Sequence, residues 1–135
     1  MISFEPAYFQ KFGFRRVQVQ LYMKSALHDL EIARKDRFPE VCFTYSYQAL
    51  IKAGIALIAV AGFKVRSIPG HHVKILEKIA EILERADVSV IGNTMRMKRN
   101  SDFYSGGEPV GEKETQDYLE FVGEILLAAQ ELMKK

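Results

Sequence analysis

Apolar residues recur at steps of three and four along two long stretches of the chain, one near its start and one at its end. This spacing gathers the apolar side chains on one face of an α-helix and leaves the other face to charged residues. It predicts a helix from Arg15 to Lys35 and another from Glu112 to the C-terminus. The apolar positions are Val19, Tyr22, Met23, Ala26, Leu30 and Ala33 in the first helix, and Thr115, Tyr118, Leu119, Val122, Ile125, Leu126, Ala129 and Met133 in the last.

The stretch from Pro39 to Gly62 predicts a helix of another kind. Proline is well tolerated in a first helical turn, so Pro39 marks a start. The first half is aromatic, and the second half is apolar nearly all round, as in a helix surrounded by other helices or by a subunit interface. The most apolar part, Ala49 to Phe63, is too short to cross a bilayer and contains Lys52. We therefore expect a core helix.

Two further helices are expected between these. Pro69-Gly70 is a turn signal, and an apolar stripe follows it from His71 to Arg85. Asp87 or Ser89 is a suitable N-cap for the next helix, and Gly106-Gly107 is suited to end it.

The first fourteen residues are rich in aromatic side chains and predict either an arm over an apolar surface or a short helix. No stretch alternates apolar and polar residues as a half-buried strand does. The pattern as a whole therefore predicts an all-α protein, an antiparallel bundle of four or five helices in a single domain over residues 1–135.

Composition narrows the function only slightly. The 135 residues carry a formal net charge of +2, so contact with nucleic acid would have to come from a local basic patch. A single cysteine, Cys42, excludes an intramolecular disulfide and is expected to be a small buried apolar residue. One cysteine and three histidines argue against a structural zinc site, and we expect no cofactor. No secretion signal is visible, so we expect a cytoplasmic protein without membrane contact.

Four segments, in order, are similar to those of the HEPN family (higher eukaryotes and prokaryotes nucleotide-binding). They are SALHDLEIARK in the first long helix, YSYQALIKAGIAL in the second, GHHVKILEKIAEIL in the third and RMKRNSDFY in the fourth. The resemblance extends from about Val17 to the end of the chain. It implies a compact helical bundle that forms a homodimer. Many members are metal-independent endoribonucleases, including toxins of toxin–antitoxin systems whose partner is a small nucleotidyltransferase, and others only bind RNA or nucleotide.

The family's active motif is an arginine, then a polar residue such as asparagine, then a histidine a few residues further on. Arg99 and Asn100 match its first two members, but residues 101–105 contain no histidine, and Tyr104 stands near the expected place. Metal-free RNA cleavage needs a base for the 2′-hydroxyl and a cation for the phosphate. Arginine suits the phosphate, whereas histidine suits the proton transfer. The resemblance therefore gives Arg99, Asn100 and Tyr104 as catalytic candidates, with Arg96, Lys98 and Arg99 at the phosphate.

Tyrosine is a poor substitute for that histidine. Its reference pKa is about 10, so it would act as a base only if neighbouring arginines lowered that pKa. On a continuous helix, five residues turn roughly 140° away from the starting face, so Arg99 and Tyr104 would not share a face. They would meet only if the helix ended near Phe103 or if two copies met across a dimer axis. The simpler interpretation is a solvated basic helix end, with a surface ion pair between Arg99 and Asp102 and a packed Tyr104.

The histidines of the chain offer an alternative to Tyr104 as the base. His71 and His72 open the third helix, where adjacent residues point to different faces, so they are first interpreted as polar residues of a helix start. Either could replace the missing base if it reached the Arg99 cleft. His28 is interpreted as a half-buried surface residue. Three functions stay open: a toxin-like ribonuclease with a degenerate motif, a non-catalytic domain that binds RNA, nucleotide or a nucleotidyltransferase, and a purely structural dimeric bundle.

Overall fold

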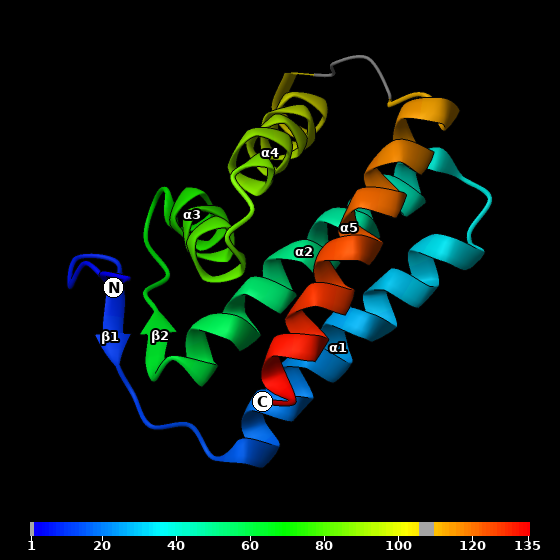
Figure 1. Ribbon diagram of the computed structural model, residues 1–135. Coiled ribbons are helices and arrows are strands. Elements are labelled where there is room, and N and C mark those ends of the chain that lie inside the picture. The colour runs from blue at the N-terminus through cyan, green and yellow to red at the C-terminus, as the bar shows by residue number, and fades with distance from the viewer. Residues whose placement is uncertain (1, 106–109) are drawn as a thin grey trace.

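The computed structural model describes residues 2–105 and 110–135, and for residues 102–105 it describes the backbone alone. The described chain contains five helices and a small two-stranded sheet (Figure 1). The helices are α1 (Arg16–Lys35), α2 (Pro39–Val60), α3 (His71–Leu83), α4 (Asp87–Ser105) and α5 (Glu112–Met133). The expected all-α bundle is confirmed, and the helix bounds differ from those expected by at most two residues at the start and end of α1 to α4.

Helix α2 is the centre of the bundle. It contacts α1, α3, α4 and α5, and α1, α2 and α5 all contact one another as a three-helix group (Figure 1). Three residues join α1 to α2, which makes these two helices antiparallel neighbours. Helices α3 and α4 pack on each other and on α2. Because neighbouring helices cover it on several sides, α2 has thirteen buried residues, among them Cys42.

The apolar character of α2 follows from this central position. By length and composition it would be able to cross a membrane, but 67% of its most apolar window is buried inside the bundle. That burial is typical of the core helix of a soluble protein. Gly54 allows the close approach of α3, since a Cβ atom there would lie 2.5 Å from Ile75 Cγ2 and 2.7 Å from Ile79 Cδ1.

The bundle also carries a small two-stranded sheet, which the sequence pattern did not predict. Strand β1 (Phe9–Lys11) pairs antiparallel with β2 (Phe63–Val65), with Gln10 opposite Lys64. The first fourteen residues were expected to form either an arm or a short helix. The structure has the arm, and β1 is part of it. Three-residue strands carry too little alternation to be distinguished from loops, so the pattern could not predict them.

Ionic and aromatic contacts attach this N-terminal arm to α3. Glu5 accepts a bond from Lys74 at 2.7 Å and lies 3.0 Å from the ammonium group of Lys78, whose side chain is 2% exposed. The Lys78 ammonium also lies 5.5 Å from the ring centre of Phe4 and 5.7 Å from that of Phe9. These two lysines hold the pKa of the Glu5 carboxyl at about 2. The arm therefore helps to fix the helix that carries His71 and His72.

Candidate functional site

A turn of fixed geometry places the two histidines at the start of α3. Gly70 has φ 83°, a left-handed conformation that side chains other than glycine rarely adopt. The backbone N–H of His71 then donates to the carbonyl oxygen of Ile68 at 3.1 Å, and the Nδ1 of the same residue lies 2.8 Å from that oxygen. Because a carbonyl oxygen only accepts, Nδ1 of His71 carries a proton. In the neutral ring, Nε2 is then the atom able to take a proton.

His72 makes its contact with the central helix. Its Nδ1 lies 2.9 Å from the hydroxyl of Tyr47 on α2. Burial and, to a smaller extent, the positive charges of His71, Arg99 and Arg96 together lower the pKa of His72 to about 4. Burial also raises the pKa of Tyr47 to about 12, although the two arginines act against that rise. At neutral pH, His72 is therefore an uncharged ring held by a protonated phenol.

The histidines lie closer together than expected. Their ring centres are 4.5 Å apart, and both residues line the same cleft. Adjacent residues on a helix do point about 100° apart. Here both residues belong to the first turn of α3, so no preceding turn of the helix stands between their two rings. The expectation that the two rings serve different faces was therefore wrong.

Helix α4 brings its basic residues to this cleft through helical spacing. Arg96, Arg99 and Asn100 are three and four residues apart, so they share one face. The Nε of Arg96 donates to Oδ1 of Asn93 at 3.2 Å. Arg99 is exposed, and its guanidinium carbon lies 5.6 Å from the ring centre of Tyr47. Among the side chains that the structure describes, no carboxylate forms an ion pair with Arg96 or Arg99.

The resulting cleft has a volume of about 440 Å³. Two guanidinium groups, two imidazoles and one amide face it, and none of its described lining residues is acidic. This combination favours an anion with several oxygen atoms, because guanidinium groups bind phosphate with a planar set of donors. The lining residues are Ser67, Ile68, Pro69, Gly70, His71, His72, Val73, Arg96, Arg99 and Asn100.

A smaller pocket of about 230 Å³ adjoins the cleft and shares His72 and Arg99 with it. Its walls are largely apolar and come from α2, with Ile51 and Ile55 beside the ring of Tyr47. The remaining lining residues are Gln48 and Lys52. Lys52 is held in place because its ammonium lies 2.8 Å from the buried Asp29 carboxylate and donates to the Ser25 hydroxyl at 2.9 Å.

One predicted site residue, Lys98, stands apart from this cleft. The ammonium of Lys98 lies 2.7 Å from a carboxylate oxygen of Glu114 on α5, and Lys98 is not among the lining residues. The side chain of Tyr104 lies outside the described residues. Its backbone belongs to α4, which continues to Ser105, two residues beyond the Phe103 end that one route to convergence needed. The route across a dimer axis stays a prediction.

Sequence reasoning missed Tyr47, although a signal was present. It is a phenol within an apolar helix, and a buried hydroxyl needs a hydrogen-bond partner. Nothing in the sequence identifies that partner as His72, which is 25 residues further along the chain.

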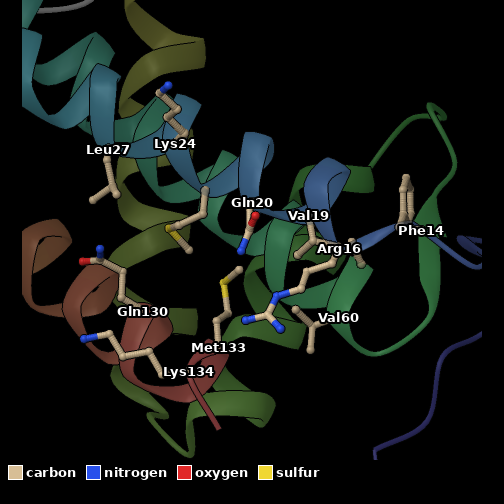
Figure 2. Close-up of a pocket in the computed structure, with 12 residues that line it drawn as sticks. Phe14, Arg16, Val19, Gln20, Lys24, Leu27, Val60, Gln130, Met133 and Lys134 are labelled. Carbon is tan, nitrogen blue, oxygen red and sulfur yellow. The ribbon is translucent and has the colours of Figure 1, made fainter.

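A larger concavity lies elsewhere, between α1 and the ends of α2 and α5, with a volume of about 560 Å³ (Figure 2). No histidine, cysteine or carboxylate lines it, so size alone does not make it a reaction site. Among the described side chains, no group of three histidines, cysteines or acidic residues is placed to hold a metal ion.

Known proteins give no assignment for either concavity. Comparison with descriptions of protein families, with curated protein sequences and with solved structures found no match for this chain.

Proposed function

We propose that this chain is a HEPN-like protein that binds RNA in the cleft between α3 and α4 and cleaves it without a metal ion. One observation carries the proposal: His71 and His72 face Arg96 and Arg99 across a single cleft. The histidine that the motif lacks after Asn100 is thus supplied by the start of another helix. Tyr104 is not needed as the base in this scheme.

The chemistry assigns a separate task to each group. Arg96 and Arg99 bind the phosphate and stabilise the negative charge that grows on it, with Asn100 donating from the same face. His71 accepts the proton of the 2′-hydroxyl at Nε2, while its Nδ1 is fixed by the Ile68 carbonyl. The 2′-oxygen bonds to phosphorus, the bond from phosphorus to the 5′-oxygen breaks, and that oxygen takes up a proton from water. The hydroxide left behind takes the proton from Nε2 of His71, which restores the neutral ring. The products are a 2′,3′-cyclic phosphate and a 5′-hydroxyl end.

The adjoining pocket supports RNA as the ligand rather than a simple phosphate. Apolar walls formed by Ile51 and Ile55 suit the flat face of a base, and Gln48 and Lys52 offer hydrogen bonds to its edge. Because Arg99 lines both spaces, a base in the pocket would place its phosphate in the cleft. We expect a preference for single strands, whose bases are free to leave the stack.

The family resemblance adds the biological setting. A cytoplasmic homodimer is expected, and a small nucleotidyltransferase is the expected partner if the protein is a toxin. RNA or nucleotide is the expected ligand, with no membrane contact. A neighbouring gene for a nucleotidyltransferase would favour the toxin–antitoxin assignment over a housekeeping role.

The decisive experiment is an RNA cleavage assay in EDTA on the wild type, Arg99→Ala and His71→Gln. We expect cleavage by the wild type and a loss of about 100-fold or more in each variant, since a positioned general base and a charge-stabilising donor each contribute about that much. Lys35→Ala is the matched control, because Lys35 is 74% exposed at the end of α1, where it pairs with Glu31. Equal cleavage by all four proteins would mean a contaminating nuclease and would end the proposal.

RNA binding without cleavage is the second candidate. The lack of a histidine in residues 101–105 favours it. It predicts salt-sensitive binding that weakens in Arg96→Ala and Arg99→Ala, with no cyclic phosphate product. If no RNA binds to the folded wild-type protein, the remaining alternative is a structural bundle with an ordinary basic surface.

A further inference from the structure

The groove between α1, the end of α2 and the end of α5 has an apolar floor. Val19 and Met23 on α1 are buried beneath it, and Leu27 and Met133 form its walls (Figure 2). Val60, at the end of α2, is 53% exposed, although it is a large apolar residue. A concave surface of this kind is suited to bury apolar side chains of a ligand.

The rim of the same groove is positively charged. Arg16, Lys24 and Lys134 line it, and no acidic residue does. Lys134 pairs with Glu131 at 3.3 Å, but among the described side chains no carboxylate pairs with Arg16 or Lys24. The side-chain amides of Gln20 and Gln130 add hydrogen-bonding groups on opposite sides (Figure 2). The groove therefore combines apolar burial with a positive border on which two of the three cations, Arg16 and Lys24, pair with no described carboxylate.

We propose that this groove binds an acidic amphipathic helix of a partner protein. Leucine-type side chains on one face of such a helix would enter the apolar floor, and glutamate or aspartate side chains beside them would meet the cationic rim. Two of the residues in the groove are methionines, whose flexible side chains adapt to different apolar partners. This inference is independent of the RNA cleft, because the two surfaces share no residue.

The spacing of the cations favours a helix over a fatty acid. Arg16 and Lys24 are eight residues apart on α1, which corresponds to about 12 Å along the helix axis. A single carboxylate cannot reach both, whereas an acidic helix presents several carboxylates along its length. A second copy of the chain is also disfavoured, because a symmetric dimer through this face would bring two positive rims together.

The test uses the full chain and a synthetic helical peptide with leucine on one face and glutamate beside it, labelled with a fluorophore. We expect saturable binding to the wild type that weakens at least tenfold in Val60→Glu and in Lys24→Glu. Leu21→Glu is the matched control for the first variant, since Leu21 is 58% exposed on α1 but does not line the groove. Lys11→Glu is the matched control for Lys24→Glu, because it changes the net charge of the protein by the same amount.

Several outcomes would overturn the proposal. One is equal binding of a scrambled peptide of the same composition, and another is tighter binding of a peptide with lysine in place of glutamate. Displacement of the peptide by decanoate at a lower concentration than the unlabelled peptide itself would assign the groove to fatty acids. A dimer in light scattering that Val60→Glu alone converts to a monomer would assign it to a second copy. Circular dichroism of each variant checks that the fold is retained.

Discussion

The hydroxyl of Tyr47 and the Nδ1 of His72 lie 2.9 Å apart, which joins the most buried helix of the bundle to the rim of the cleft. Tyr47 is 1% exposed, so its position is set by the packing of α2. The same ring lies beneath the guanidinium of Arg99. One core side chain thus orients two groups of the candidate site, and its hydroxyl can be removed with little change in packing.

Tyr47→Phe is expected to affect the cleft more than the fold. The ring still fills its place in the core, and the loss of one hydrogen bond costs about 0.5–1.5 kcal/mol in the free energy of unfolding. Without the hydroxyl, the His72 ring is free to rotate, so RNA cleavage or binding should weaken. Urea unfolding measures the change in the free energy of unfolding, and an RNA assay measures the change in cleavage or binding. A variant with full RNA activity and unchanged His72 resonances would contradict this role.

The lowered pKa of His72, about 4, predicts how stability depends on pH. The unfolded chain binds a proton at an ordinary histidine pKa near 6.5, whereas the folded chain resists that proton. The contribution of His72 to stability is therefore complete above about pH 6.5 and is lost as the pH falls toward 4. As the pH is lowered from 7 to 4, the urea midpoint of unfolding should fall more steeply for the wild type than for His72→Asn. Parallel curves would show that burial does not hold the ring neutral.

Most of the fold could be predicted from the sequence, because apolar spacing reports which face of each helix is buried. The stripe from Val19 to Ala33 predicted α1, and the all-apolar half of α2 predicted its central position. The small sheet was missed because Phe9–Lys11 and Phe63–Val65 pair through backbone groups across more than fifty residues. Such pairing leaves almost no pattern in the side chains.

The candidate site was less predictable. The spacing of Arg96, Arg99 and Asn100 is a local property of α4, so the sequence indicated that they share a face. The approach of His71 and His72 depends on the turn at Gly70 and on the way α3 packs against α4, which are tertiary properties. Local periodicity likewise could not predict that Lys98, in the middle of the same basic segment, turns to Glu114 on α5.

Gly54→Ala tests how closely α2 and α3 must approach. The added Cβ would lie within 3.0 Å of three side-chain atoms of Ile75 and Ile79. Overpacking of this kind costs about 1–3 kcal/mol, which offsets or exceeds the gain of about 1 kcal/mol from alanine in a helix. We expect a lower thermal midpoint and weaker RNA binding, because α3 carries the histidines. Gly13→Ala, with nothing within 4 Å of its Cβ, should change neither.

Glu5→Gln tests whether the N-terminal arm is held by charge. Lys78 is almost fully buried, and Glu5 is one of its carboxylate partners, with Glu81 at 3.0 Å as another. Removing one partner of a buried ammonium leaves its desolvation partly uncompensated, so we expect a loss of about 1–3 kcal/mol in the free energy of unfolding. Amide exchange in β1 and β2 should also become faster. Glu31→Gln, which removes an exposed pair with Lys35, should leave both measurements unchanged.

The salt dependence of RNA binding tests the two arginines separately from any catalysis. Each phosphate that a cation neutralises releases counterions, so the logarithm of the binding constant falls with the logarithm of the salt concentration, with a slope of about −0.7 per contact for a single strand. Arg96→Ala and Arg99→Ala should each reduce the steepness of that slope by about this amount. The double variant should show the sum, because the two side chains reach the cleft independently from successive turns of α4.

Fluorescence anisotropy with a labelled single-stranded RNA between 50 and 300 mM salt, roughly the range over which such slopes are resolved, provides the measurement. An unchanged slope in both variants would place the phosphate outside this cleft, and the assignment of the site to RNA would then fail even if the protein bound RNA elsewhere.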